Sequence, residues 1–219
     1  MDRQPAMQTY NTIQTFTIGQ IENNTYLLMK PDSRKAVVID PAAGISEVID
    51  SMHTQNLELE SIWVTHAHFD HIAGVYSLLS EFGSHIPIFL HPDDLPLWNS
   101  GGGAREFGFE FDPKAQPTRF FFHGQHIPFG DSAIEVRHTP GHTPGHVLLY
   151  WQASRTAFCG DLIFYHSIGR TDMAYCDSAA LRNSIREQVL TLPDATALFC
   201  GHGPVTSVSE ERKNNPFLD

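Results

Sequence analysis

Seven side chains in four short segments have the types and spacing of metal ligands. The first segment, residues 66–71, reads HAHFDH and holds three histidines and an aspartate in six positions. Side chains two apart in an extended chain share a face, so His66 and His68 can reach one ion. Asp70 and His71 stand at the expected turn into a helix, are directed differently, and could serve a second ion.

Three later segments each offer one further ligand. In HTPGHTPGH, proline and glycine on both sides of His142 favour a tight turn that projects its ring. Asp161 and His202 each end an apolar run, directly after a glycine that allows backbone and ion to approach closely. One such histidine is usually structural. Five histidines and two aspartates, each at a strand end or a turn, indicate a dinuclear metal site.

A scaffold of short strands and a few helices must position these segments. Apolar or alternating runs predict strands over residues 15–20, 24–30, 35–40, 61–66, 87–91, 133–139, 146–152, 156–161 and 197–201. Helical spacing of apolar residues predicts helices over residues 45–55, 72–82 and 178–190. The stretch 93–99 is predicted as a short helix or turn, and 100–119 as a long loop of the kind that forms a lid or binding loop. Strands followed by a helix in each half indicate two facing sheets with helices outside.

The bulk properties restrict the class of protein. A chain of 219 residues with 41% apolar residues and 18% charged residues is typical of a soluble globule with one large domain. Its formal charge of −11 argues against a nucleic-acid or anionic-membrane partner. No apolar run is long enough to span a membrane, and the N-terminal residues show no leader pattern. Three cysteines are too few for a disulfide framework, so a cytoplasmic location is expected.

Together these segments resemble the metallo-β-lactamase fold superfamily, whose H-x-H-x-D-H signature is present as HAHFDH. The resemblance extends from NTYLL and AVVIDP near the N-terminus to GHGP near the C-terminus. It implies an α+β protein, a four-layer αβ/βα sandwich of two mixed β-sheets with helices on the outer faces. A single domain over residues 1–219 is expected.

The resemblance also divides the ligands between two ions and implies a mechanism. Carried over by position, the first ion is held by His66, His68 and His142, and the second by Asp70, His71 and His202. Asp161 bridges the two ions. These donors suit zinc, which we expect, and also iron or manganese. Two adjacent cations acidify a shared water and polarise a carbonyl oxygen, so a bridging hydroxide is the expected nucleophile. Asp70 is the candidate proton acceptor.

Within the superfamily, GDLIFYHSIGRTD and the terminal NNPFLD are most similar to the short glyoxalase II-like (hydroxyacylglutathione hydrolase-like) enzymes. This similarity implies hydrolysis of a thioester such as S-lactoylglutathione. In glyoxalase II, a basic residue shortly after the bridging aspartate binds a carboxylate of glutathione, and Arg170 stands about there. Arg170 could equally pair with Asp172 and fix the loop.

Two departures weaken the glutathione assignment. The chain is expected to lack the C-terminal helical domain that completes a glutathione site. Thr171 and Asp172 stand where a tyrosine usually contacts glutathione, and MAYCD at 173–177 replaces a glycine-rich segment. The rival reaction is that of a mononuclear iron persulfide dioxygenase, with iron on His66, His142 and Asp161. A lactonase or another ester hydrolase of the same fold is a further alternative, and a non-catalytic metal-binding module is disfavoured because no ligand is missing.

Several neighbouring residues have open roles. His138 and His146 flank His142 and are better suited to supporting the ligands or the turn than to binding the ions themselves. Asp40, at the end of VVID, could orient a ligand histidine or cap the next turn. His166 faces either substrate or solvent, and Cys176 lies in a loop. We expect a small-molecule thioester or ester as partner, and a monomer or small homo-oligomer.

Overall fold

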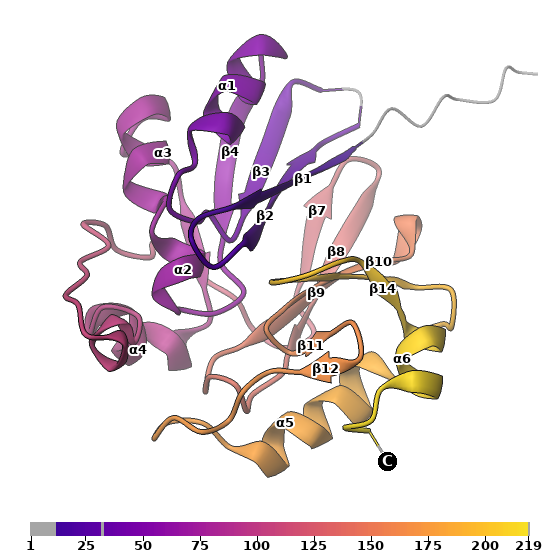
Figure 1. The fold of residues 1–219 in the computed structure, drawn as a ribbon. Helices are drawn as coiled ribbons and strands as arrows, with labels where there is room; N and C mark the ends of the chain where they lie inside the picture. Colours follow the sequence, from indigo (N-terminus) through magenta and orange to yellow (C-terminus); the bar gives the residue numbers. More distant parts are fainter. Residues whose placement is uncertain (1–11, 32, 219) are drawn as a thin grey trace, which may run out of the picture.

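The structure is a computed structural model that describes residues 12–31 and 33–218 (Figure 1). Two expectations therefore fall partly outside the described residues. These are the absence of a leader pattern at the N-terminus and the extension of one domain over both ends of the chain. None of the helices in the described ranges combines the length and apolarity needed to cross a bilayer.

The first half of the chain builds a six-stranded mixed sheet. Its strands, in hydrogen-bonded order, are β1 (Ile13–Ile18), β2 (Asn23–Met29), β3 (Lys35–Ile39), β4 (Glu58–Trp63), β5 (Ile88–Leu90) and β6 (Arg119–Phe120). Strand β2 is antiparallel to both β1 and β3, and β3 to β6 run parallel. The carboxyl ends of the parallel strands therefore meet at one edge, which is where ligands bind in such sheets.

The second half builds another six-stranded mixed sheet. Its order is β14 (Thr206–Ser207), β13 (Ala197–Cys200), β10 (Thr156–Gly160), β9 (Val147–Trp151), β8 (Ser132–His138) and β7 (His126–Phe129). Only β10 and β13 run parallel, so Asp161 and His202 follow neighbouring strands at the same edge. A separate hairpin joins β11 (Ile163–Phe164) to β12 (Ser167–Ile168).

Helices cover the outer faces of both sheets, as Figure 1 shows. They are α1 (Ser46–Thr54), α2 (Phe69–Ile72), α3 (Val75–Phe82), α4 (Leu95–Asn99), α5 (Ser178–Ser184) and α6 (Val208–Asn214). A π-helical turn (Ile185–Val189) continues α5. Helix α3 packs a stripe that includes Val75 and Leu78 on the first sheet and ends before Gly83, whose φ of 112° a side chain disfavours.

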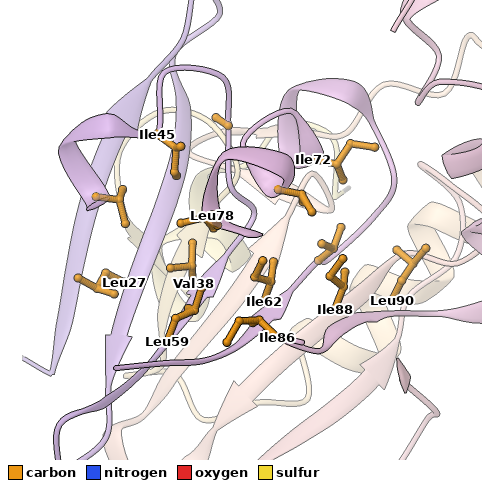
Figure 2. Packing of buried hydrophobic residues seen from close by; sticks show 14 of the residues in the cluster. Leu27, Val38, Ile45, Leu59, Ile62, Ile72, Leu78, Ile86, Ile88 and Leu90 are labelled. Carbon is orange, nitrogen blue, oxygen red and sulfur yellow. The ribbon is translucent and has the colours of Figure 1, made fainter. Parts of the chain in front are cut away.

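The alternation of side chains along buried strands explains the layers. Leu27 and Val38 point into a core between the first sheet and the helices α1 and α3, where they meet Ile45 and Leu78 (Figure 2). Their chain neighbours, such as Leu28, point into the opposite core between the two sheets. Because both faces are covered, these strands read in the sequence as continuous apolar runs.

The second sheet follows the same rule. Leu149 faces the core between the sheets, whereas Leu148 faces a third core that also contains Leu181 of α5 and Val208 of α6. Three cores separate four layers, helix, sheet, sheet and helix. The expected α+β sandwich of two mixed sheets with outer helices is therefore confirmed.

The described residues contain several elements that the sequence patterns did not indicate. They are the short strands β6, β7, β11, β12 and β14, the helix α6 and a 3₁₀ turn (Ala104–Phe107) inside the predicted loop 100–119. Most of these have two to four residues, which is too short for periodicity to register. Helix α6 reads VSEERKN and is polar except at its first residue, so it lacks an apolar stripe.

Candidate metal centre

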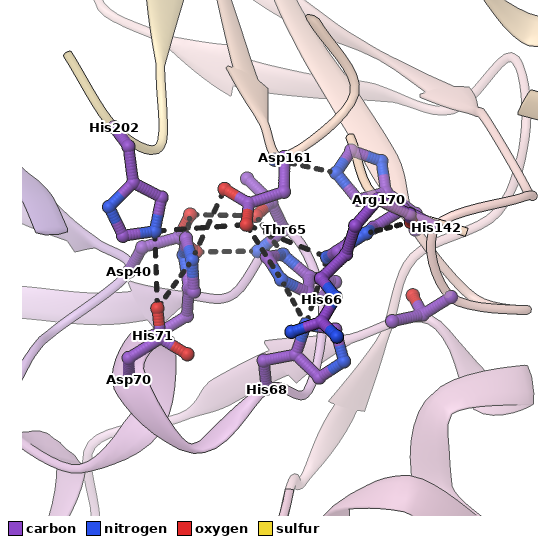
Figure 3. A network of polar contacts seen from close by, with 12 residues as sticks. Asp40, Thr65, His66, His68, Asp70, His71, His142, Asp161, Arg170 and His202 are labelled. Atoms are coloured by element: carbon purple, nitrogen blue, oxygen red, sulfur yellow. Dashed lines mark hydrogen bonds and ion pairs between the residues drawn. The ribbon is translucent and has the colours of Figure 1, made fainter. Parts of the chain in front are cut away.

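The first four predicted ligands lie where the chain leaves β4 and enters α2. His66 is fully buried, and His68 keeps an extended backbone (φ −68°, ψ 145°) just before the helix. Asp70 and His71 lie within α2. This change from extended chain to helix sends His66 and His68 to one cluster of side chains, and Asp70 and His71 to another (Figure 3).

The other three predicted ligands follow strands of the second sheet. His142 lies in the loop between β8 and β9, Asp161 follows β10, and His202 follows β13. Gly201 shows why a glycine is needed before His202, because a Cβ there would lie 2.1 Å from Oδ1 of Asp161. All seven predicted side chains are therefore brought to one place by the two sheets.

Four of the seven side chains form a first cluster. Nδ1 of His68 lies 3.0 Å from Nε2 of His66 and 2.9 Å from Nε2 of His142. Oδ2 of Asp161 lies 3.5 Å from Nε2 of His142. Three imidazole nitrogens and a carboxylate oxygen within a few ångströms of one another are a donor set typical of zinc and related cations.

The remaining side chains form a second cluster beside the first. Oδ2 of Asp70 lies 3.2 Å from Nε2 of His202 and 3.3 Å from Nε2 of His71. Oδ1 of Asp161 lies 3.3 Å from Nε2 of His71, while its Oδ2 faces the first cluster. Asp161 thus stands between the clusters, where the resemblance placed a bridging ligand. Its role as a ligand stays a prediction.

Each of the five histidines uses its outward ring nitrogen for a hydrogen bond. The partners are Thr65 Oγ1 for His66, Tyr175 Oη for His68, Asp40 Oδ2 for His71, the Arg170 carbonyl for His142 and the Ile21 carbonyl for His202. A carbonyl or carboxylate can only accept, so the outward nitrogen carries the proton in at least three of the rings. The inward nitrogen then presents its lone pair to the centre, which is how metal-binding histidines are held in proteins.

Two buried atoms test whether the centre fits metal ions. Nε2 of His71 and Oδ1 of Asp161 are buried and lie 3.3 Å apart, yet neither has a partner of hydrogen-bond geometry among the described residues. A buried polar atom without a partner costs about 1–3 kcal/mol, so such atoms normally have an explanation. Both point into the gap between the two clusters. Bound cations would satisfy them, and the residues therefore fit a metal site.

The charges of the ligands also suit cations. Burial lowers the pKa of His66 well below its ordinary value and that of His68 to about 3, and neighbouring histidines add to the effect. Burial opposes ionisation of Asp161, but the adjacent His71 holds the pKa of Asp161 below its ordinary value. Neutral imidazoles and ionised carboxylates are the forms that bind metal, so His66, His68 and Asp161 are already in the binding form. Burial opposes protonation of His71, but Asp70, Asp161 and Asp40 raise the pKa of His71 well above its ordinary value, so a cation would bind there in exchange for a proton.

Two supporting residues fulfil roles that the sequence left open. Asp40 orients a ligand, since its Oδ2 lies 3.0 Å from Nδ1 of His71, and it also accepts hydrogen bonds from Thr65. His146 accepts a hydrogen bond from the backbone N–H of Asp161 at 3.1 Å. His146 therefore supports the centre from outside.

Asp94 is a supporting residue that the sequence analysis missed. It is fully buried and accepts hydrogen bonds from the N–H of Ala67, the hydroxyl of Thr143 and the N–H of Gly145. Burial raises the pKa of Asp94 to about 6 against these donors. It ties the His66–His71 segment to the His142 loop. The only local signal was an acidic residue before a short helix, which is indistinguishable from a cap.

The remaining candidates lie around the centre. Arg170 forms a bidentate ion pair with Asp172, with N–O distances of 2.7 and 2.8 Å. Of the two roles expected for Arg170, the structure therefore shows the pair with Asp172 that fixes the loop. The ring of His166 contacts Glu210 at 2.8 Å instead of the centre. The ring of His138 contacts the carbonyl of Pro144. The thiol of Cys176 contacts the carbonyl of His142.

A cavity of about 370 Å³ opens onto the centre. Its floor is polar, and its walls include the apolar side chains of Ile21, Phe69, Phe107, Phe164, Ile168 and Met173. Phe107 belongs to the predicted loop 100–119, and its ring lies over Phe69, with centroids 5.4 Å apart. The loop therefore forms one wall of the cavity. Arg170 is the only lysine or arginine among the lining residues.

The comparison with protein families identifies the superfamily. Residues 18–202 match the sequence model of the Metallo-beta-lactamase superfamily. The chain belongs to the metallo-β-lactamase superfamily. The resemblance inferred from HAHFDH is therefore confirmed, and the matched range includes all seven candidate ligands.

The chain is also similar to individual members of known sequence or structure. The chain is 31% identical to the hydroxyacylglutathione hydrolase GloC of Haemophilus influenzae, over 94% of this chain and 98% of that protein. The crystal structure of BLEG-1, named a B3 metallo-beta-lactamase, has a TM-score of 0.87 and 33% identity, over 94% of this chain and 99% of that one. TTHA1623, crystallised in a di-iron-bound form, has a TM-score of 0.84 and 36% identity, over 94% of this chain and 100% of that one. Superfamily membership and the clustered ligands support a metal-dependent hydrolase.

Proposed function

We propose that the protein hydrolyses thioesters, with two divalent metal ions bound at the centre. His66, His68 and His142 would hold one ion, and Asp70, His71 and His202 the other. Asp161 would contact both. Zinc is the first candidate, and iron or manganese suits the same donors. The observation that carries the proposal is the convergence of all seven side chains in two adjacent clusters, with five of the seven lining one cavity.

Two bound divalent ions supply Lewis acidity, which polarises a carbonyl oxygen and allows a water to lose a proton near neutral pH. The chain supplies the rest. The outward hydrogen bonds hold the ligand rings in place, and the apolar walls provide a surface for the acyl group of the substrate. His71, together with His202, keeps the pKa of Asp70 low despite burial, so Asp70 is ionised at the cavity wall, which is the form in which it would bind a cation.

The choice of a thioester rests on the similarity to GloC, together with the nature of the cavity. A thioester carbonyl is reactive and carries an apolar sulfur, and the apolar walls suit both the sulfur and a short acyl group. Because Arg170 is already paired with Asp172, the cavity offers no unpaired Lys or Arg for a carboxylate. We therefore propose that the protein hydrolyses thioesters, and we do not include recognition of glutathione in the proposal.

The test combines metal analysis with turnover of S-lactoylglutathione, a simple neutral acyl thioester and a lactone. We expect two ions per chain and faster turnover of a thioester than of the lactone. His142→Ala should lose one ion and at least about a thousandfold in kcat/KM, because it removes a ligand that also borders the substrate cavity. The matched control is His126→Ala, an exposed histidine on β7 that should behave like wild type.

Two results would contradict the proposal. Full activity of His142→Ala would refute the ligand assignment. One iron per chain with oxygen consumption on glutathione persulfide, and no thioester turnover, would instead assign the dioxygenase reaction.

A further inference from the structure

Two large apolar side chains carry the wall of the cavity beside the centre out to solvent. Phe107 lines this cavity and is nevertheless 54% exposed. Ile21, from the turn between β1 and β2, also lines the cavity and is 52% exposed. Apolar side chains left in water around a polar floor are typical of ligand cavities, because a bound apolar group covers them and removes that surface from water.

Backbone contacts hold Phe107 beside the centre. Phe107 ends the 3₁₀ turn Ala104–Phe107, and the chain just before this turn packs on α2. The backbone N–H of Phe69 donates to the carbonyl of Gly102 at 2.9 Å, and a Cβ on Gly102 would lie only 2.5 Å from the same nitrogen. Helix α2 also carries Asp70. The wall that Phe107 forms is therefore attached to the helix that supplies part of the centre.

The charges near Phe107 favour an uncharged ligand. Among the described residues that line the cavity, Arg170 is the only lysine or arginine, and its guanidinium carbon lies 5.7 Å from the centroid of the Phe107 ring. Asp172 accepts two hydrogen bonds from Arg170, and the carboxylate of Glu106 also interacts with its charge. The whole chain has a formal charge of −11. An anionic substituent therefore gains little here, whereas an apolar one meets a matching surface.

We propose that Phe107 is a specificity-determining residue that contacts an apolar group of several carbons next to the thioester bond of the substrate. The substrates are then uncharged thioesters with an extended aliphatic or aromatic substituent. This inference rests on the proposed thioester hydrolysis and goes beyond it, because hydrolysis itself requires only a carbonyl at the centre. Burial of the substituent against Phe107 and Ile21 stabilises the bound states relative to free substrate, so it raises kcat/KM.

The experiment uses the metal-loaded full chain and two series of uncharged thioesters. In the first series, the acyl group on N-acetylcysteamine grows from acetyl to butanoyl and hexanoyl. In the second, the thiol of an acetyl thioester grows from ethanethiol to butanethiol and hexanethiol. We expect kcat/KM to rise about two- to fourfold for each added methylene in at least one series. Phe107→Ala should lower kcat/KM about tenfold for the six-carbon substrate of that series and less than about twofold for the two-carbon substrate.

Phe109→Ala is the matched control. Phe109 belongs to the same loop, is 44% exposed and packs edge-to-face on Phe69 with ring centroids 5.0 Å apart, but it does not line the cavity. Phe109→Ala should keep the wild-type dependence of kcat/KM on chain length. An equal dependence on chain length in Phe107→Ala and wild type would overturn the proposal.

Binding measurements separate this inference from the proposed function. S-ethyl- and S-hexyl-N-acetylcysteamine contain no thioester bond, and calorimetry gives their affinities for wild type and Phe107→Ala. Turnover of thioesters at rates independent of chain length in both series would overturn the role of Phe107 and leave thioester hydrolysis standing. Tighter binding of the S-hexyl compound that is lost in Phe107→Ala, without turnover of any thioester, would support the apolar contact and refute thioester hydrolysis.

Discussion

At the scale of single residues, the proposed ligand histidines are held by hydrogen bonds to outer partners. His68 is the clearest case. Its Nε2 lies 2.7 Å from the hydroxyl of Tyr175, and that hydroxyl donates to the sulfur of Met173 at 2.9 Å. A hydroxyl that donates to sulfur must accept from Nε2–H, which leaves Nδ1 of His68 free for the centre. Tyr175 thereby selects the tautomer of a ligand.

Tyr175→Phe tests this selection. The variant removes the acceptor for Nε2–H of His68 and leaves the ring that packs beside it. Loss of such an outer partner typically weakens metal binding about 10- to 100-fold. Competition with a chromophoric chelator measures the effect directly. Tyr165→Phe, which alters an exposed tyrosine outside the lining of the cavity, is the control. Equal affinity in Tyr175→Phe and wild type would show that Tyr175 does not set the tautomer.

Asp172→Asn tests whether Arg170 can recognise carboxylates. Asp172 occupies both Nε and Nη2 of the guanidinium, and removal of its charge releases Arg170 toward the cavity. We expect the KM for S-lactoylglutathione, which carries carboxylates, to fall about two- to tenfold, since charge-assisted bonds at exposed sites are modest. The KM for a neutral thioester should not change. Steady-state kinetics on both substrates decide the matter, with Asp50→Asn on the exposed face of α1 as a charge-matched control. A parallel fall for both substrates would exclude carboxylate recognition by Arg170.

At the scale of elements, the centre depends on loops that are held to one another. The turn between β4 and α2 comes from the first sheet, and the loop between β8 and β9 comes from the second. Asp94 lies between them and accepts three hydrogen bonds. Two of these come from backbone N–H groups, with donor–acceptor distances of 2.8 and 2.6 Å. Neither loop contains regular structure at its ligands, so their relative position depends on this carboxylate.

Asp94→Ala should therefore be strongly destabilising. It leaves the N–H groups of Ala67 and Gly145 and the hydroxyl of Thr143 buried without their acceptor. We expect a loss of about 3 kcal/mol in the free energy of unfolding, together with weaker metal binding. Urea unfolding followed by circular dichroism gives the first quantity. Asp50→Ala removes an exposed carboxylate from α1 and should change stability by less than about 0.5 kcal/mol. A similar small effect in both variants would mean that Asp94 does not hold the loops.

At the scale of the whole molecule, the centre connects the two halves of the chain. Four of its side chains come from the first sheet and three from the second, and the buried aromatic and aliphatic residues between the sheets lie behind them. Ions bound at such a junction interact with both halves at once. Their binding energy therefore contributes to the stability of the complete fold.

Removal of metal should accordingly lower the thermal stability. Chelation of the loaded protein with EDTA is expected to lower Tm by several degrees, and added zinc should restore it. Differential scanning calorimetry measures the change. The same treatment of His142→Ala should produce a smaller shift, because that variant lacks part of the centre. An unchanged Tm in wild type after verified loss of metal would contradict this coupling between the halves.

The sequence by itself determined the types of the candidate ligands, the main strand and helix patterns of the two halves and the superfamily. The HAHFDH motif and the buried strands are local, since short-range spacing and apolar runs carry them. Only the tertiary structure decided how Asp161 lies between the clusters, which partner each outer ring nitrogen has, and that Arg170 pairs with Asp172. Asp94 and Tyr175 gained their roles from contacts 51 and 107 residues away along the chain. Such contacts arise from the packing of two sheets and leave no periodic or local mark in the sequence.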